Sequence, residues 1–392
     1  MPELTLPEQH PARVLWRLVE TLDLSKFVEG ARAVEGRQGR DVTSVRMLLT
    51  LWMYAVSEGI GSAREIERRQ TTDPAFQWIV GDQQVGRTTI AAFRVSHRAA
   101  LDALFTDVLG VLMHRGVLSL ALVAQDGTRV RASAGAPSFR REASLRACRE
   151  QARLHVRAVL AAADDPEAEA RLQRVREAKA REAEARIEAA IAEVHELRAE
   201  GLGGAEPRAS TTDPDARVMK MPDGGFRPAY NVQMATAGDP MGGPRTIVGV
   251  RVTSRGSDTS SVKPMLDQIE ARTGELPKQL LADANHASVA DICDATRRGV
   301  TPLISVPERM RRGADNASRE PEFVAWKAHM QTDEAKQTLR ARASLCELTN
   351  AHVKTRYAMA SLLVRGLDKV TSVALLTALT ANLLAHASSL LT

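Results

Sequence analysis

Residues 118–133 read LSLALVAQDGTRVRAS, and this stretch decides the fold of the chain. It begins with an apolar run and then alternates apolar with polar residues, which predicts a β-strand that is buried first and half-buried later. Asp126 stands where the apolar run stops. A carboxylate at the end of a buried strand is costly unless a cation meets it. The stretch therefore predicts a strand that presents an acidic group to a cationic partner.

Further strands and helices follow in a regular order. The segments RPAYNVQMATA and RTIVGVRVTS predict two neighbouring strands joined by the turn GDPMGGP. After them come a helix ending at Gly274, the strand KQLLADAN, a helix ending at Gly299, the strand TPLISV and, beyond residue 320 or so, more helix. Three strands, helix, strand, helix, strand, helix is the order of an α/β fold. We expect a mixed sheet with flanking helices.

Residues 1–115 are predicted to form an all-helical region, because apolar residues recur there at helical spacing. Ser62 and Glu65 have the spacing of a capping box, and a later helix is expected to start at Thr88 or Thr89. Short helices with clustered arginines resemble a helix-turn-helix unit that binds DNA phosphates. An ordinary helical bundle with a solvated basic face is the alternative. The expected DNA-binding residues of this region are Arg64, Arg68, Arg69 and Arg94.

Residues 139–200 are rich in Ala, Glu and Arg, and the sequence Asp164-Asp165-Pro166 interrupts them. This pattern predicts two long helices that form an antiparallel hairpin inserted into another domain. Four apolar residues of the second helix recur at coiled-coil spacing: Ile187, Ile191, Val194 and Leu197. Such a seam needs a partner helix, from the hairpin itself or from a second subunit. We expect a structural or intersubunit role for the hairpin, not a catalytic one.

The composition permits a polyanionic partner without requiring one. The chain has 53 Lys and Arg against 48 Asp and Glu, a formal charge of +5. Its three cysteines lack zinc-binding spacing, and their small number fits a reducing cytoplasm. We expect no signal peptide, because MPELTLPEQHPARV lacks a basic start followed by an apolar run. The apolar residues 370–392 include Asn382 and His386, so we expect a core helix there rather than a membrane span.

Two acidic residues stand at the ends of predicted strands. Asp126 follows LALVAQ, and Asp283 follows LLA. In open α/β sheets, ligands bind at the ends of strands. A single aspartate in such a place is usually a turn former. Two on strands expected to be neighbours favour a shared metal site, because Mg²⁺ prefers carboxylate oxygens.

Several ordered motifs together resemble those of DDE transposases of bacterial insertion sequences. They are QDGTRVRAS, TDPDARVMK, RPAYNVQMA, LADANHAS and ELTNAHVKTRYAMASLLVRGLDKV. The resemblance covers nearly the whole chain. It implies a ribonuclease-H-like catalytic domain over residues 116–392, interrupted by the hairpin at 139–200, behind a DNA-binding helical domain at 1–115.

The resemblance also implies the site residues. The first catalytic aspartate matches Asp126 in DGT, the second matches Asp283 in ADA, and the third acid matches Glu347. Lys354, seven residues further on, lies two helical turns away on the same face and is implied to contact DNA phosphate. These acids would hold two Mg²⁺ ions per active site, with Mn²⁺ as a substitute. The implied partners are the double-stranded DNA of element ends and target, and a second copy of the chain, in the bacterial cytoplasm at the nucleoid.

Two positions depart from the pattern of the family. Asn285-His286 follows the second aspartate, where many relatives have Gly-Tyr. Ala343 stands four residues before Glu347, where many relatives carry an arginine, and Arg340 or Arg342 is the expected substitute.

Glu347 is preferred as the third acid because of its setting. Leu345, Cys346 and Leu348 flank it at the start of a partly apolar helix, which can hold a carboxylate accurately. The rival acids lie in polar segments that look solvated: Glu308, Glu320, Glu322, Asp333 and Glu334.

Other polar residues have two readings. Asp213 and Asp215 form either a second acidic site or, as we prefer, a turn in which Asp213 is a cap. Asp258 is expected near a helix N-cap, and His286 either touches DNA or metal or is a neutral surface residue. Two alternative functions remain beside a transposase. One is a catalytically inactive, transposase-derived DNA-binding protein, and the other is a ribonuclease-H-fold nuclease without strand transfer.

Overall fold

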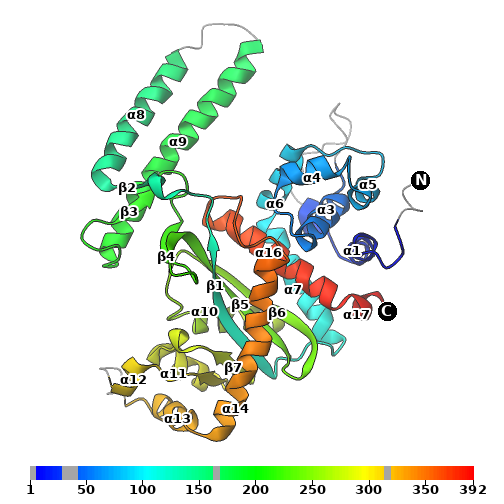
Figure 1. Cartoon of the computed structure of the whole chain (residues 1–392), viewed down its shortest axis with the longest axis vertical. Helices are drawn as coiled ribbons and strands as arrows, with labels where there is room; N and C mark the ends of the chain where they lie inside the picture. Colours follow the sequence, from blue (N-terminus) through cyan, green and yellow to red (C-terminus); the bar gives the residue numbers. More distant parts are fainter. Residues whose placement is uncertain (1–5, 29–42, 162–167, 313–318) are drawn as a thin grey trace.

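A computed structural model describes residues 6–28, 43–161, 168–312 and 319–392 (Figure 1). It is a mixed α/β structure in which helices surround a mixed sheet. The predicted break at Asp164-Asp165-Pro166 lies outside the described residues. The expectation of an α/β fold with strands of both directions is confirmed.

The main sheet has strand order β4-β5-β1-β7-β8, with β6 also paired to β5. The strands β4, β5, β6 and β1 pair antiparallel, whereas β1 pairs parallel to β7 and β7 parallel to β8. The strands of this sheet are β1 (Leu122–Arg131), β4 (Arg217–Lys220), β5 (Phe226–Asp239), β6 (Gly242–Thr253), β7 (Gln279–Ala282) and β8 (Thr301–Ile304).

The five strands expected from the sequence are all present, because each is an apolar or alternating run long enough to fill the sheet. Three short strands were missed: β4 in the main sheet, and the separate pair β2 (Phe139–Arg141) and β3 (Arg208–Ser210). Runs of three or four residues that are mostly polar carry no clear periodicity.

The helices that follow the strands cover the sheet. The crossovers to the parallel strands are α10 (Val262–Thr273) and α11 (Val289–Arg297). The chain then continues through α12 (Glu308–Arg312), α13 (Pro321–His329), α14 (Asp333–Arg342), the π-helical turn η5 (Ala343–Glu347), α15 (Leu348–Thr355), α16 (Leu367–Ala385) and α17 (Ala387–Leu391). Of these, η5 packs against β1 and β5, and α16 packs against β6.

The open edge of β6 is covered by helices. Asn382 of α16 accepts from the backbone N–H of Ile247 at 2.8 Å and donates to its carbonyl at 2.8 Å. Gln268 of α10 accepts from the N–H of Val250 at 2.7 Å. Unpaired backbone groups at a sheet edge invite pairing with other chains. Here the side chains of Asn382 and Gln268 form hydrogen bonds with the backbone groups of this edge.

The N-terminal helices share a hydrophobic core with the sheet. They are α1 (Pro11–Glu20), α2 (Ser25–Val28), α3 (Val45–Ser57), α4 (Ala63–Arg69), α5 (Pro74–Val80), α6 (Arg87–Ser96) and α7 (Arg98–His114). Ser62 caps α4 as predicted, accepting from the N–H of Glu65 at 3.3 Å. Helix α6 begins slightly earlier than expected, with Gly86 at its N-cap. The buried residues of these helices belong to the same core cluster as those of the sheet.

The helical hairpin projects away from the sheet (Figure 1). It consists of α8 (Glu142–Ala161) and α9 (Ala168–Ala199), which pack side by side. The seam residues Ile187, Ile191 and Val194 are buried against Leu145 of α8 and Ala209 of β3. The partner of the seam is therefore the hairpin itself and the short strand at its base.

Helix α16 is the one helix among the described residues that is long and apolar enough to cross a membrane. In its most apolar window, 67% of the residues are buried inside the protein. It packs against β6, α7, α6 and α3. This placement agrees with the expected core helix.

Candidate active site

The sheet places Asp126 and Asp283 next to each other. The parallel ladder between β1 and β7 pairs Val123 with Leu280 and Ala124 with Leu281. Two residues further on, the same register aligns Asp126 with Asp283, which directly follows β7. Neighbouring strands are about 4.8 Å apart, and residues in register point to the same face. The two carboxylates are therefore neighbours at the carboxyl end of β7.

Glu347 is brought to this end of the sheet by η5, which packs on β1 and β5. Arg342 connects it to the first aspartate. One Nη of Arg342 donates to Glu347 at 2.7 Å, and the other lies 3.8 Å from the Asp126 carboxylate. Asn350 of α15 donates to Asp126 at 3.1 Å. The charge of Arg342 also acts on Asp283, so all three predicted acids lie around one guanidinium.

The three acids are not as close as ligands of a single ion would be. In the described parts of the chain, one set of three Asp, Glu, His or Cys residues has ligand atoms within 4.8 Å of one another, and it is a different set. The cation that Asp126 and Glu347 share in this structure is Arg342. Asp126 and Glu347 both lie close to this guanidinium, so this place in the protein favours positive charge. Carboxylate oxygens are also the ligands that Mg²⁺ prefers.

The two aspartates have opposite pKa shifts. Burial raises the pKa of Asp126, although the charges of Arg342 and His286 oppose the shift. Burial would also raise the pKa of Asp283, but hydrogen bonds from His286 and from the Asn285 backbone bring it down to about 2. Asp126 is thus the carboxylate whose charge is less well compensated.

The π-helical turn explains how Arg342 reaches Glu347. In a π-turn, residues five apart are hydrogen-bonded neighbours, whereas in an α-helix residues four apart are. Arg342 and Glu347 are five apart and flank or end this turn. Of the two expected substitutes for an arginine at position 343, the structure places Arg342 on the acids.

Asp283 is hydrogen-bonded to a buried polar network. His286 Nδ1 lies 2.7 Å from the Asp283 carboxylate, and Nε2 lies 3.1 Å from the Gln233 side-chain oxygen. Gln233 donates in turn to Asp258 at 2.5 Å, and Asn231 donates to the same oxygen at 2.7 Å. The His286 side chain is fully buried. Of the two readings of His286, the neutral surface residue is therefore wrong. Asp258 stands three residues before Ser261, the N-cap of α10, but its side chain accepts from residues of β5.

Gly127 is required by this network. A Cβ atom at position 127 would collide with Gln233 and Asp258 and would lie 2.8 Å from the Asn231 side-chain oxygen. The glycine after Asp126 therefore leaves room for the polar groups of β5. A glycine inside a strand is the sequence signal that could have indicated this close approach, which was not predicted.

Asp213 and Asp215 hold the start of α16. Asp213 is fully buried and accepts from the Tyr230 hydroxyl at 2.7 Å and from the N–H of Gly366 at 3.0 Å. Asp215 accepts from the N–H of Leu367 at 2.7 Å. The predicted turn is present, since the N–H of Ala216 donates to the Asp213 carbonyl at 3.1 Å, but the Asp213 side chain binds the start of a helix that is distant in sequence.

The predicted DNA-binding residues have different surroundings. Lys354 is half-buried near Asp126, and burial lowers its pKa. Arg68 and Arg69 pair with Glu65 at 2.6 and 2.9 Å, and Arg64 is exposed. Arg94 is buried: its guanidinium lies 4.1 Å from the centre of the Trp52 ring and donates to the Gly61 carbonyl at 3.0 Å.

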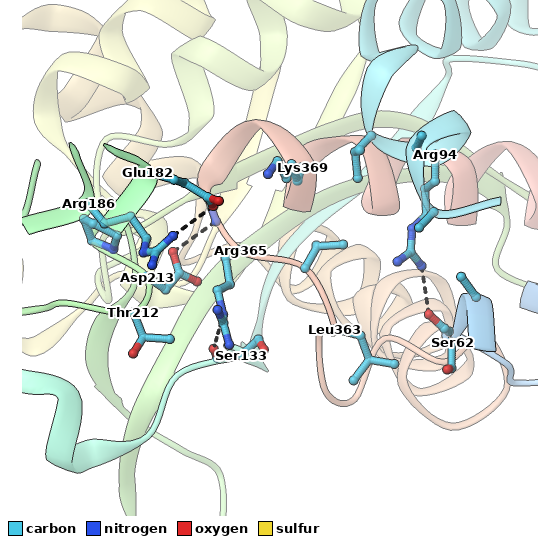
Figure 2. Close-up of a pocket in the computed structure, with 18 residues that line it drawn as sticks. Ser62, Arg94, Ser133, Glu182, Arg186, Thr212, Asp213, Leu363, Arg365 and Lys369 are labelled. Atoms are coloured by element: carbon cyan, nitrogen blue, oxygen red, sulfur yellow. Dashed lines mark hydrogen bonds and ion pairs between the residues drawn. The ribbon is translucent and has the colours of Figure 1, made fainter. Parts of the chain in front are cut away.

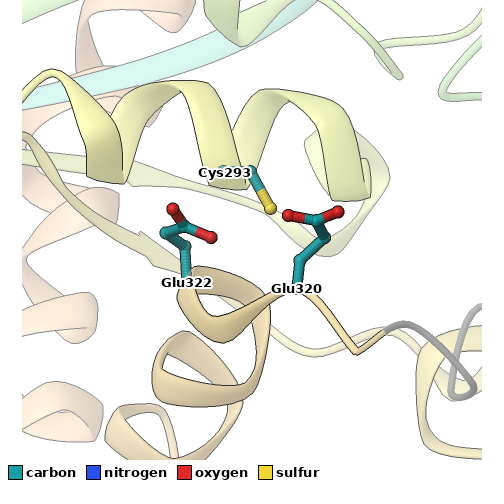
Figure 3. Close-up of side chains that lie close together, drawn as sticks. All are labelled: Cys293, Glu320 and Glu322. Carbon is teal, nitrogen blue, oxygen red and sulfur yellow. The ribbon is translucent and has the colours of Figure 1, made fainter.

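The rival acids are either paired with an arginine or exposed. The set with ligand atoms within 4.8 Å is Cys293, Glu320 and Glu322 (Figure 3). Both glutamates already pair with Arg297, at 2.7 and 2.8 Å. A guanidinium that neutralises both carboxylates leaves little reason for a metal there. Three further rivals are exposed: Glu308, Asp333 and Glu334.

Residues 3–96 match a family model described as a transposase domain (DUF772). The matched part contains the helices from α1 to α6 and the predicted DNA-binding arginines. The N-terminal region of the chain is thus similar to a transposase domain. No curated protein and no solved structure matches the chain.

Proposed function

We propose that this chain is a DDE-type DNA transposase that cuts element ends and joins them to target DNA. The observation that carries the proposal is the register that aligns Asp126 with Asp283 on neighbouring parallel strands. A transposase-domain match in the N-terminal region supports the same class.

A ribonuclease-H-like catalytic domain is part of this proposal. Its support is the order of elements: the three long antiparallel strands β1, β5 and β6, then a helix and a parallel strand, twice, followed by helices. Asp126 lies on β1 and Asp283 directly follows β7, the neighbouring strand, and Glu347 comes from the helices that follow the sheet. The hairpin of α8 and α9 is an insertion between the first two of these strands.

The residues have distinct proposed roles. Asp126, Asp283 and Glu347 would hold two Mg²⁺ ions, or Mn²⁺ in their place. When bound, such ions activate a water or a DNA 3′-hydroxyl and stabilise the leaving oxygen. Arg342 donates to Glu347 at 2.7 Å and compensates part of the charge of Asp126 from 3.8 Å. The His286–Gln233–Asp258 network fixes the orientation of Asp283, and Lys354 would contact a DNA phosphate.

Double-stranded DNA is the proposed partner, bound by a homodimer in the cytoplasm. Two other readings compete with it: a catalytically inactive DNA-binding relative, and a ribonuclease-H-fold nuclease that cleaves without joining. All three acids lie around one guanidinium, which favours a catalytically active protein over an inactive DNA-binding relative. Only the products of the reaction separate a transposase from the second.

The proposal is tested with the purified chain, Mg²⁺ and DNA that carries the flanks of its own coding sequence. We expect both nicked ends and strand-transfer products. Asp126→Asn, Asp283→Asn and Glu347→Gln should each reduce cleavage by roughly 10³-fold or more, because each removes a ligand worth several kcal/mol in the transition state. DNA binding should be unchanged.

Matched controls are Asp333→Asn and Glu334→Gln, which change exposed acids of α14. Cleavage without joined products would favour a nuclease. Full activity of the Glu347→Gln variant would reject Glu347 as the third acid.

A further inference from the structure

A cavity of about 610 Å³ lies where the N-terminal helices, the hairpin and the start of α16 meet (Figure 2). Four cationic side chains line it: Arg94 of α6, Arg186 of α9, Arg365 and Lys369. It also contains Glu182 and Asp213. The cavity is separate from the three acids of the candidate active site.

The charge of this cavity is positive and incompletely compensated. Glu182 pairs with Arg186 at 2.8 Å, and one oxygen of Asp213 accepts from Tyr230 and from the start of α16, while its other oxygen has no hydrogen-bond partner among the described residues. Arg365 donates through Nε to the Ser133 carbonyl at 3.1 Å, and Lys369 is exposed. Two acids therefore face four cations.

Arg94 is the most informative of these residues. Its side chain is buried, and its Nε has no hydrogen-bond partner among the described residues. Within 4.0 Å, no carboxylate of the described chain pairs with it. A buried charge is costly unless an opposite charge meets it. The Gly61 carbonyl and the Trp52 ring stabilise the guanidinium in part, but neither carries a negative charge, and a phosphate in the cavity would supply one.

The position of the cavity relative to the acids favours DNA over a small anion. Strand β1 leads from Asp126 toward Ser133, which lines the cavity. Seven extended residues span at most about 23 Å. At 3.4 Å per base pair, that is roughly seven base pairs of a DNA duplex. One duplex can therefore reach both places.

We propose that this cavity binds a backbone phosphate of DNA, with Arg94, Arg365 and Lys369 as its cations. The inference rests on the proposed function and adds a second anchoring point between the helical region and the hairpin. Because phosphates carry no sequence information, this interaction positions the duplex and does not read its bases.

The test is the affinity of the full chain for a labelled 40-base-pair duplex, measured between low and high salt without Mg²⁺. The double variant Arg365→Ala/Lys369→Ala should bind every sequence more weakly, by roughly tenfold or more at low salt. The log–log salt slope should become shallower by about 1, because the variant loses the cations that neutralise the one phosphate bound in the cavity. A second variant, Arg94→Met, keeps an apolar cover on Trp52 while removing the charge, and should also weaken binding.

The matched control is Arg115→Ala/Lys278→Ala, which removes two exposed cations outside the cavity. It should leave the slope closer to that of the unmodified chain. If the cavity variant and the unmodified chain bind alike, the cavity proposal is overturned while the catalytic proposal stands. If the unmodified chain binds no duplex at all, both are overturned.

Discussion

At the scale of single residues, Asp126 carries a charge that its surroundings only partly compensate. Burial raises its pKa, so the ionised form is less stable in the folded protein than in the unfolded chain. Above the unfolded pKa of about 3.9 this charge lowers the stability of the fold. A bound cation would remove that cost.

This argument predicts the behaviour of Asp126→Asn without any activity assay. At neutral pH and without metal, the variant should unfold at a Tm about 1–3 °C higher than the unmodified chain, because the poorly compensated charge is gone. Added Mg²⁺ should raise the Tm of the unmodified chain by mass action but not that of the variant. Differential scanning calorimetry measures both.

The control is Glu275→Gln, which changes an exposed acid in a loop away from the sheet ends. It should keep the full Mg²⁺ response. An equal Mg²⁺ response in Asp126→Asn would contradict the role of Asp126 as a ligand.

The sequence was enough to predict Asp126 and Asp283, but not the side chains that hydrogen-bond to them or pair with them. Each aspartate ends an apolar run, which is a local signal. The network of His286, Gln233 and Asp258 joins three separate segments, and nothing local in any of them indicates the other two. Arg342 was one of two candidates for the arginine beside Glu347. The sequence could not decide between them, because α-helical spacing does not include the extra residue of the π-turn.

At the scale of elements, η5 joins α14 and α15 through one extra residue. A deletion inside an α-helix rotates everything beyond it by about 100°, which turns buried residues toward solvent. A deletion inside a π-turn converts it to α-helix and leaves both faces aligned. The two kinds of deletion should therefore differ sharply.

Deleting Ala343 should be tolerated, with Arg342 and Glu347 then four apart and still able to pair. Deleting Ala351 of α15 should rotate Val353, which is buried, and lower the stability by about 3 kcal/mol or more. Thermal unfolding followed by circular dichroism measures the difference. Equal losses in the two variants would argue against the π-turn.

The longer elements could be predicted from the sequence, and their physical basis is clear. Strands β1, β5 and β6 span 10, 14 and 12 residues, and each contains a run of consecutive buried residues, which is ten residues long in β5. Strand β4 has four residues, and its exposed Val218 gives no signal of a buried face. Its pairing with β5 depends on the turn between them.

At the scale of the whole molecule, the hairpin is attached by its base. Arg217 of β4 pairs with Glu193 of α9 at 2.6 Å, and both side chains are largely buried. Further out, Arg153 of α8 pairs with Glu184 of α9 at 3.2 Å. The two helices are thus close enough at this level to be joined by a short link.

Replacing residues 154–181 with a short Gly/Ser linker should therefore leave the sheet intact. We expect the Tm and its increase with Mg²⁺ to stay close to those of the full chain, because the base cluster around Leu145 and Val194 is kept. Removing the whole of α8 and α9 should instead cost about 1–3 kcal/mol, since Arg217 would lose its partner. A lost Mg²⁺ response in the shorter truncation would show that the hairpin belongs to the metal site.

The shared core has a consequence for how the protein is made. Helix α16 packs against α3, α6 and α7 as well as β6, so the first helices complete their packing only when residues 367–385 are available. A ribosome adding about 5–20 residues per second needs tens of seconds to pass from α7 to α16. During that interval the nascent N-terminal helices expose apolar surface. Folding of the chain is therefore expected to finish after synthesis rather than during it, which makes chaperone protection of the growing chain important for its yield.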